Sequence, residues 1–218
     1  MQPARPAGLA PGLRQFWHDA GPNVSVSRAP GPGPPRLAPE HAVTPDKVYL
    51  VGFMAAGKST VGRALAERLG WRAEDVDDLI EQREGLTVSE IFARFGEPHF
   101  RRVEREMLRL LQPMRHVVVA TGGGTFVDPE NRALINLDGI SVWLDLPLSE
   151  IAARIPLDGR RPLAADRAAL EQLYVARTES YRHAHVRIDA SRLALPDVVD
   201  RIQDALTSRL LLVDPPPV

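Results

Sequence analysis

The strongest constraint on this chain is residues 47–60, which read KVYLVGFMAAGKST. Residues 47–51 are mostly apolar β-formers and predict a short buried strand. Residues 52–59 match the phosphate-binding loop pattern of Gly, four residues, Gly, Lys and Ser. Residues 61–69 then place apolar side chains at helical spacing until Gly70 ends the run. The pattern therefore stands between a strand and a helix, the setting in which such a loop holds phosphate.

Each position of the loop has a chemical reason. Gly52 and Gly57 let the backbone turn tightly and expose N–H groups to an anion. Lys58 brings a charge to the β- and γ-phosphates of a nucleotide, and Ser59 offers a hydroxyl to Mg²⁺. A plain glycine-rich turn is the alternative, but composition disfavours it, since the chain has two lysines, Lys47 and Lys58, against 25 arginines. A lysine retained here indicates that the site needs a compact ammonium group.

Composition narrows the class of protein. The 218 residues suffice for one sizeable core or two small ones. A net charge of −1 creates no overall field that would attract nucleic acid or acidic lipid. The absence of cysteine excludes disulfides, thiolate metal sites and cysteine nucleophiles. No apolar run approaches the roughly 18 residues of a membrane span. We therefore expect no nucleic-acid partner and no membrane partner.

Three parts differ in composition. Residues 1–44 hold nine of the 20 prolines and show no apolar period, so we expect a Pro-rich disordered extension. The folded domain is expected at residues 45–212, and a Pro-rich tail at 213–218. We interpret the extension as a dispensable tail or an over-called start site. A transit peptide would be Arg-bearing and acid-poor but richer in serine, and a secretory signal would need an apolar segment that is missing.

Strands alternate with helices through the folded part. The expected strands are residues 47–51, 71–76, 117–120, 140–146 and 186–188. The expected helices are residues 58–69, 79–83, 98–111, 149–154, 167–182 and 195–210, with a capping box at 87–90 and another helix that starts at Pro129 after the cap Asp128. This alternation predicts an α/β fold, a three-layer sandwich with a five-stranded parallel sheet flanked by helices. Ligands then bind at the carboxyl ends of the strands.

Polar and glycine-rich segments follow the expected strands and should meet at that edge. Asp75 and Asp77 end the second strand, so one carboxylate can hold Mg²⁺ through water and the other can accept a proton from a substrate hydroxyl. The alternative is that Asp77 only caps the next helix. Gly122, Gly123 and Gly124 follow the third strand, and they form either a plain turn or a stretch of bare backbone that a ligand can approach.

Several arginines could meet anionic groups. Arg101 either pairs with Glu97 and Glu104 on a helix surface or offers a guanidinium fork to a substrate carboxylate. Other arginines lie on or beside an expected loop, where one could neutralise a transferred phosphoryl group: Arg154, Arg160, Arg161 and Arg177.

These motifs together resemble the shikimate kinases, P-loop enzymes that phosphorylate the 3-hydroxyl of shikimate with ATP. The similarity spans about residues 47–210, with the motifs in the family's order: GFMAAGKSTVGRALAERL, EDVDDLIEQREG, SEIF, FRRVE, TGGG, RRPL, and Tyr181 after Arg177. The resemblance implies a P-loop kinase fold with a mobile lid and the product shikimate 3-phosphate, in aromatic amino acid biosynthesis. It also implies ATP and Mg²⁺ as cofactors.

The resemblance assigns a role to each site residue. Asp77 binds the shikimate hydroxyls and is the candidate catalytic base. The other catalytic residues that the resemblance implies are Lys58 and, on the lid, Arg161, which reaches the phosphoryl group. The shikimate carboxylate is held by Arg101 and Arg177, with Glu104 orienting Arg101. Phe92, Gly122, Gly123 and Gly124 shape the substrate pocket, and Ser59 and Asp75 serve Mg²⁺. The nucleotide is held by Gly52, Ala55, Ala56, Gly57, Lys58, Ser59, Thr60, Arg154 and Arg161.

Four departures from the family pattern stand out. Ala55 replaces the glycine usual in the loop, Thr121 replaces an apolar residue, Ala164 follows RRPL in place of leucine, and residues 183–185 are unusually polar. None removes a residue assigned to chemistry. We expect a cytoplasmic, monomeric enzyme. The alternatives are another P-loop small-molecule kinase, such as a gluconate or nucleoside monophosphate kinase, and a catalytically silent nucleotide-binding module.

Overall fold

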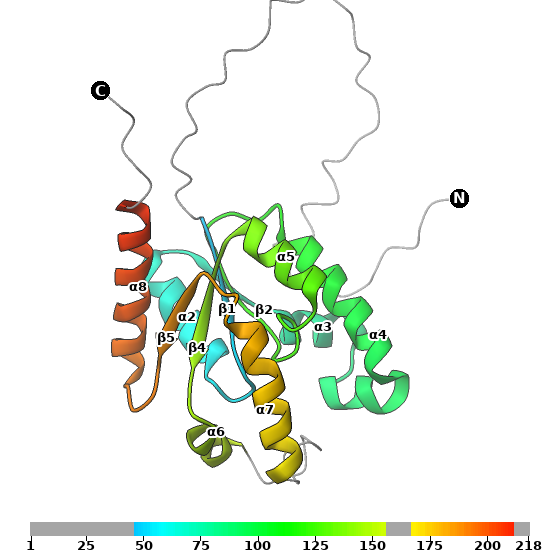
Figure 1. The fold of residues 1–218 in the computed structure, drawn as a ribbon. Coiled ribbons are helices and arrows are strands. Elements are labelled where there is room, and N and C mark those ends of the chain that lie inside the picture. The colour runs from blue at the N-terminus through cyan, green and yellow to red at the C-terminus, as the bar shows by residue number, and fades with distance from the viewer. Residues whose placement is uncertain (1–45, 156–166, 212–218) are drawn as a thin grey trace, which may run out of the picture. The chain divides into compact units, whose positions relative to one another are not determined.

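A computed structural model describes residues 46–155 and 167–211, all within one compact unit, Pro45–Val218. Figure 1 shows an α/β fold. Its strands are β1 (Lys47–Val51), β2 (Arg72–Asp75), β3 (Val117–Ala120), β4 (Ile140–Asp145) and β5 (Val186–Asp189). They form one sheet in the order β2-β3-β1-β4-β5, and each neighbouring pair is parallel. The predicted five-stranded parallel sheet is therefore confirmed.

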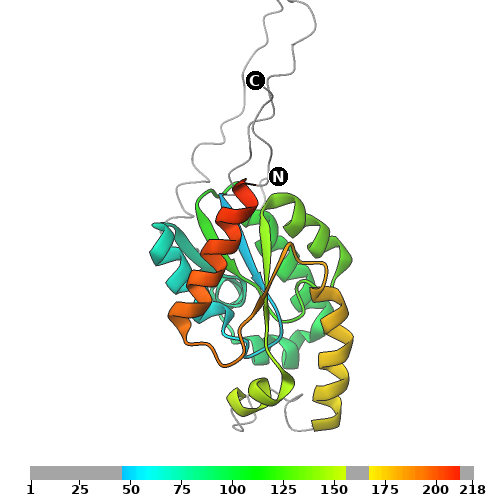
Figure 2. The same ribbon diagram turned by 60° about the vertical axis from the view of Figure 1, so that its left-hand side comes forward.

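Helices cover both faces of this sheet. They are α2 (Lys58–Leu69), α3 (Val76–Glu84), α4 (Val88–Leu111), α5 (Pro129–Asp138), α6 (Leu148–Arg154), α7 (Arg167–Tyr181) and α8 (Leu195–Leu211). Figures 1 and 2 show α2 and α8 on one face, with α4, α5 and α7 on the other. Every residue of β1 and β3 is buried, as expected for strands covered on both faces.

The helix α4 differs most from the sequence expectation. It joins the capping-box segment and the helix expected from residue 98 into one element with a kink at Gly96, whose φ of 75° and ψ of 173° are not helical. The capping box itself is confirmed: the Glu90 N–H donates to the Thr87 hydroxyl at 3.3 Å, and the Thr87 N–H donates to Glu90 Oε2 at 2.8 Å. Pro98 follows the kink, where its missing N–H costs little.

The strand β2 is shorter and the helix α3 is longer than expected from the sequence. β2 ends at Asp75 because the Asp75 carboxylate accepts the Asp77 N–H at 3.0 Å and caps α3 from Val76 onward. The alternative in which Asp77 caps this helix is therefore wrong. The remaining boundaries differ from expectation by a residue or so, as helix and strand ends commonly do.

The amino-terminal edge of the sheet is held by a buried lysine. Lys47 is fully buried, and its ammonium donates to the carbonyls of Leu111 and Gln112 at 2.8 Å each and to Asp138 Oδ2 at 2.7 Å. The Tyr49 hydroxyl donates to the same carboxylate oxygen at 2.5 Å. Burial, and then Asp138, raises the pKa of Tyr49. This cluster joins β1 to the carboxyl ends of α4 and α5.

Some expectations fall on residues that the structure does not describe. The extension at 1–44, the tail at 213–218 and the segment with Arg160, Arg161 and Ala164 lie outside the described residues. None of the helices within residues 46–155 and 167–211 is both long enough and apolar enough to cross a bilayer.

Candidate active site

The phosphate loop, residues 52–59, connects β1 to α2 at the carboxyl edge of the sheet. Gly57 is the N-cap of α2 with a φ of 89°, and Gly52 has a φ of 140°. A Cβ atom at Gly52 would lie 2.8 Å from the carbonyl oxygen of Leu144, so β4 leaves no room for a side chain there. Ala55 has a φ of 59°, which is the left-handed conformation that glycine adopts more readily.

The Lys58 ammonium points back into the loop. It donates to the carbonyl oxygens of Gly52 at 2.9 Å and Phe53 at 2.7 Å, and the residue is only 7% exposed. The loop and the amino end of α2 thus hold a cation next to the position that a bound phosphate would take. Ala56 is buried in the same loop, and Thr60 is exposed in the first turn of α2.

Ser59 and Asp75 come together as the sequence predicts. The Ser59 hydroxyl donates to Asp75 Oδ2 at 2.5 Å, while the other oxygen of this carboxylate caps α3. Both oxygens of Asp75 are therefore fixed beside the phosphate loop. A small cavity of about 70 Å³ adjoins these two side chains, lined also by residues such as Arg63 and Asp78.

The glycine loop, residues 122–124, is the point where the other predicted site residues meet. A Cβ atom at Gly122 would lie 2.9 Å from Asp77 Oδ1. At Gly123 it would lie 3.3 Å from Arg177 Nη1 and 3.1 Å from the backbone nitrogen of Met54 in the phosphate loop. Two helices that are far apart in the sequence, α3 and α7, thus bring charged side chains against this loop, and the backbone of the phosphate loop also lies next to it.

Gly124 completes this arrangement. A Cβ atom there would lie 2.4 Å from Arg101 Nη2, so the guanidinium lies directly against bare backbone. Each of the three glycines therefore faces a different charged side chain, in the order Asp77, Arg177 and Arg101. The glycine loop is not a plain turn, and its lack of side chains is what lets these groups approach.

Arg101 is anchored by two glutamates of its own helix. Its Nη1 donates to Glu104 Oε2 at 2.9 Å, and its Nε and Nη2 donate to Glu97 Oε1 at 3.1 and 3.0 Å. Burial alone would lower the pKa of Arg101, but Glu104 and then Glu97 outweigh burial, and its pKa is raised. The surface pairing considered from the sequence is thus real, yet it also orients the guanidinium toward the glycine loop.

Arg177 reaches the same loop from α7. Its guanidinium carbon lies 5.7 Å from the centre of the Phe53 ring. Burial lowers the pKa of Arg177; Tyr181 acts against this, and the positive charge of Arg101 adds to it. Two guanidinium groups close enough to affect each other would be stabilised by a shared anion.

Tyr181 holds α7 to the glycine loop. It is almost completely buried, and its hydroxyl donates to the carbonyl of Gly123 at 2.5 Å. Burial raises the pKa of Tyr181, with Arg177 acting in the opposite direction. The sequence analysis singled out Tyr181 only because it follows Arg177 in the family pattern. Nothing in the sequence around Tyr181 predicts its contact with Gly123, which lies 58 residues away.

Aromatic rings lie beside Arg101 on α4. Phe92 is 37% exposed, and its ring centre lies 4.7 Å from that of Phe100. The Arg101 guanidinium carbon lies 5.2 Å from the Phe100 ring centre. Phe92 therefore packs on the ring that lies next to Arg101, and its contact with a substrate stays a prediction. The contact of Phe100 with Arg101 was not predicted.

Two more residues, Arg154 and Arg161, were predicted to contact the nucleotide. Arg154 ends α6, is 42% exposed in its side chain and lies 3.4 Å from Glu150 Oε2, so its contact with a nucleotide base stays a prediction. Arg161 lies in the undescribed segment between α6 and α7. The structure also shows two residues close to the glycine loop whose contacts the sequence analysis missed, Thr125, which follows the loop, and Arg132, which holds the segment after it. Arg132 Nη1 donates to the carbonyls of Phe126 and Val127 at 3.2 Å each.

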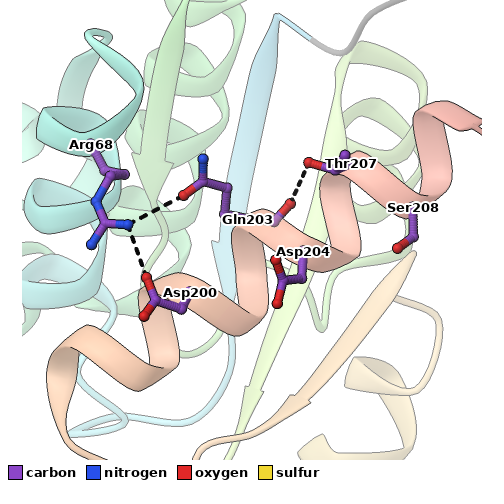
Figure 3. A pocket seen from close by; sticks show the side chains of 6 residues that line it. All are labelled: Arg68, Asp200, Gln203, Asp204, Thr207 and Ser208. Carbon is purple, nitrogen blue, oxygen red and sulfur yellow. Dashed lines mark hydrogen bonds and ion pairs between the residues drawn. The ribbon is translucent and has the colours of Figure 1, made fainter.

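A separate hollow lies away from this site, between α2 and α8 (Figure 3). Its volume is about 580 Å³, and it is lined by Arg68, Asp200, Gln203, Asp204, Thr207 and Ser208. Arg68 donates to Asp200 at 2.9 Å and to Gln203 at 3.4 Å. The side chains of Arg68 and Asp200 are each about half exposed. This is an open polar groove, and it contains none of the predicted site residues.

The chain is similar to known proteins over most of its length. Residues 54–207 match the family model described as shikimate kinase. A shikimate kinase of Geobacter metallireducens is 42% identical over 165 residues, which cover 74% of this chain and 92% of that protein. The solved shikimate kinase of Acinetobacter baumannii in complex with shikimate is 37% identical, has a TM-score of 0.73, and the match covers 77% of this chain and 96% of that one.

A second solved shikimate kinase is also similar to this chain in sequence and fold. The shikimate kinase of Aquifex aeolicus is 32% identical with a TM-score of 0.70, and the match covers 76% of this chain and 98% of that one. The family match spans more than half of the chain and includes the glycine loop and the residues that face it. The chain therefore belongs to the shikimate kinase family.

Proposed function

We propose that this protein transfers the γ-phosphoryl group of ATP to the 3-hydroxyl of shikimate, which gives shikimate 3-phosphate and ADP. One observation carries the proposal: Asp77, Arg177 and Arg101 face three successive glycines, and the phosphate loop lies next to them. Two guanidinium groups suit the single carboxylate of a small acid. An aspartate suits its hydroxyls, and bare backbone leaves space for its ring. The family to which the chain belongs supports the same substrate.

ATP binds through the phosphate loop. The N–H groups of the loop and the amino end of α2 face the phosphates. When ATP binds, the Lys58 ammonium exchanges the carbonyls of Gly52 and Phe53 for β- and γ-phosphate oxygens. Because these carbonyls hold the ammonium beforehand, little of its motion must be restricted on binding.

Ser59 and Asp75 are the residues that would hold Mg²⁺. A hydroxyl and a carboxylate oxygen 2.5 Å apart, next to the phosphate site, are hard oxygen donors of the kind that Mg²⁺ prefers. Mg²⁺ commonly takes only one or two protein ligands beside phosphate oxygens and water. When bound, it neutralises charge on the phosphates of the nucleotide.

The transfer step needs one proton acceptor and close positioning. Arg101 and Arg177 hold the shikimate carboxylate, which directs the ring hydroxyls toward Asp77. The Asp77 carboxylate takes the proton of the 3-hydroxyl as its oxygen attacks the γ-phosphorus. The bond between this phosphorus and the β–γ bridging oxygen breaks, and ADP leaves. Most of the acceleration comes from positioning and charge neutralisation. A contribution from Arg161, a monomeric state and a cytoplasmic location stay predictions.

The direct test is coupled ADP release by the purified protein with ATP and Mg²⁺. Shikimate, gluconate and nucleoside monophosphates are offered in parallel. We expect ADP release that depends on shikimate alone. Release with another acceptor would favour a different P-loop kinase, and ATP binding without release in any reaction would favour a silent nucleotide-binding module.

The role of Asp77 has its own test. Removal of a general base typically lowers the rate by about 10²–10⁴-fold, so Asp77→Asn should reduce kcat by about 10²-fold or more and leave the ATP affinity near that of the wild type. Asp78→Asn is the matched control, because it removes a neighbouring carboxylate from the same first turn of α3. Wild-type turnover in Asp77→Asn would exclude Asp77 as the base.

A further inference from the structure

Thr125 follows the glycine loop directly and is fully buried. Its hydroxyl donates to Glu104 Oε1 at 2.6 Å. Glu104 is fully buried on α4, and its other oxygen, Oε2, accepts from Arg101 Nη1 at 2.9 Å. A hydroxyl, a carboxylate and a guanidinium therefore form a continuous chain of hydrogen bonds from the glycine loop to the arginine that faces it.

The orientation of Arg101 depends mainly on Glu104. The other partner of Arg101, Glu97, has a side chain that is 62% exposed, whereas the side chain of Glu104 is 0% exposed. Exposed ion pairs are weakened by water and by salt, while a buried carboxylate holds its partner in a defined direction. After these contacts, each Nη atom of Arg101 still has one N–H with which to bind a carboxylate.

Glu104 in turn depends on Thr125. Each of its two oxygens has one donor, and the space around them is narrow, because a Cβ atom at Gly122 would lie 3.2 Å from Oε1 and 3.1 Å from the Thr125 hydroxyl oxygen. Without this hydroxyl, one oxygen of a buried carboxylate lacks a donor, which is unfavourable. The carboxylate can recover a donor by turning Oε1 toward Arg101, and this draws the guanidinium away from Gly124.

We propose that Thr125 is a positioning residue whose hydroxyl fixes Glu104 and thereby sets the Arg101 guanidinium for the carboxylate of the acceptor. The inference rests on the proposed function for the identity of that acceptor, shikimate. It adds to that function a determinant of acceptor affinity that touches neither substrate. The role of Thr125 is thus confined to the acceptor side of the site.

The test is Thr125→Val, which keeps the size of the side chain and removes the donor. Loss of a hydrogen bond to a charged group predicts that the KM for shikimate rises by about tenfold. The kcat and the KM for ATP should stay within about twofold of the wild type. Thr125→Ser, which keeps the hydroxyl, should restore most of the shikimate KM.

Thr121→Val is the matched control. Thr121 is also a buried threonine next to the glycine loop, but its hydroxyl donates to the carbonyl of Leu50 at 2.9 Å. This variant loses a similar hydrogen bond without touching Glu104, so both KM values should stay near those of the wild type. Thermal unfolding of both valine variants separates lost stability from lost positioning. If Thr125→Val does not fold, Thr125→Cys, with its weak donor, takes its place with the same expected direction.

A double variant shows whether Thr125 acts through Glu104. In a Glu104→Met background, where position 104 offers no acceptor to the Thr125 hydroxyl, Thr125→Val should add little to the shikimate KM. Three results would overturn the inference: equal KM values in Thr125→Val and Thr121→Val, an equal rise in the KM for ATP, and fully additive effects in the double variant.

The inference and the proposed function can fail separately. A wild-type protein without shikimate-dependent ADP release refutes the proposed function. A crystal structure of Thr125→Val still tests the inference, because the guanidinium of Arg101 should then leave its place against Gly124. An unmoved guanidinium would refute the role of Thr125.

Discussion

At the scale of single residues, glycine serves two different purposes in this chain. Gly57 and Gly70 have φ values of 89° and 67°, and a Cβ atom at either would meet nothing within 4 Å, so their backbone conformation requires glycine. Gly124 is not among the described glycines with a positive φ, yet a Cβ atom there would lie 2.4 Å from Arg101 Nη2. The first kind of glycine shapes the backbone, and the second makes room for a charged side chain.

Gly124→Ala separates these two purposes. The backbone accepts alanine, and the obstructing atoms are the mobile end of an arginine, so the protein should fold while Arg101 moves away from the glycine loop. Because hydrogen bonds to charged groups are worth about 1.5–3 kcal/mol, we expect the KM for shikimate to rise roughly tenfold or more. The KM for ATP should change little. Steady-state kinetics with each substrate varied in turn provides the measurement.

Gly70→Ala is the control of the other kind. Its added methyl group has room, but alanine in a left-handed conformation should cost about 1 kcal/mol of unfolding free energy. Both KM values should stay unchanged. If Gly124→Ala lost stability and kept its shikimate KM, Gly124 would be needed for the backbone conformation and not to make room for Arg101.

At the scale of elements, the lysine outside the phosphate loop joins a strand to two helices. Lys47 lies at the start of β1, and its ammonium bonds to Leu111 and Gln112 at the end of α4 and to Asp138 at the end of α5. An ammonium can direct its three donors to three separate acceptors, whereas a guanidinium fork is planar and longer. A lysine in this Arg-rich chain therefore marks a second place where a compact cation is required.

Lys47→Met should lower the free energy of unfolding by about 3–5 kcal/mol, because it leaves the Asp138 carboxylate partly buried without its cation. Urea denaturation measures the loss. The KM values should not change, because the cluster lies at the amino ends of the strands and the site lies at their carboxyl ends. Arg115→Met removes an exposed ion pair with Asp46 at the same edge and should cost no more than about 1 kcal/mol. Equal losses in the two variants would contradict the assignment.

The order and type of the elements could be predicted from the sequence, but some of their joints could not. Apolar runs predicted strands such as β1 and β3, and the capping box predicted the start of α4. The expected break before residue 98 is only a kink at Gly96, because the helix continues on both sides of one non-helical residue. The cap of α3 was assigned to Asp77 as an alternative, whereas the carboxylate that serves is that of Asp75.

Lys58, Asp75 and Asp77 were predictable because they stand in motifs at strand ends, which a parallel sheet brings together. Arg101 and Arg177 lie inside helices α4 and α7, and their common role was expected only from the family resemblance. The hydroxyls that support these charged groups could not be predicted. Thr125 contacts Glu104 across 21 residues, and Tyr181 contacts Gly123 across 58. A buried hydroxyl leaves no period or spacing in a sequence, so only the folded structure identifies such contacts.

At the scale of the whole molecule, the two edges of the sheet carry different ionisable groups. At the edge away from the site, His185 Nδ1 accepts the Ser141 N–H at 3.2 Å, which requires a neutral ring. Arg209 donates to the carbonyl of His185. Burial, and then Arg209, lowers the pKa of His185 from its usual 6.5. The bond from the imidazole to Ser141 of β4 exists only while the ring is unprotonated. The contact with Arg209 of α8 uses the backbone carbonyl and does not depend on the charge of the ring.

The stability of the protein should therefore fall as the pH drops below about 6.5. In that range the unfolded chain binds a proton at position 185 more readily than the folded protein does, and the loss continues down to the lowered pKa of the folded state. His185→Asn offers an amide oxygen that does not titrate, so its unfolding free energy should depend less steeply on pH between about 6.5 and 5. Denaturation curves at several pH values measure the slope.

His183→Asn is the control for that series. His183 lies two residues earlier and is exposed, and its imidazole takes part in none of the described hydrogen bonds. Its variant should keep the wild-type slope. The same slope in His185→Asn as in the wild type would show that this half-buried histidine does not govern acid stability.

The burial of both lysines has a practical consequence. Lys47 is 0% exposed and Lys58 is 7% exposed, and the chain has no other lysine. Reagents that acylate side-chain amines should scarcely modify the native protein, and a protease that cuts only after lysine should leave the folded domain intact. Both act as soon as β1 and α2 open. Brief exposure to either one thus measures the unfolded fraction, and nucleotide binding at Lys58 should slow the reaction further.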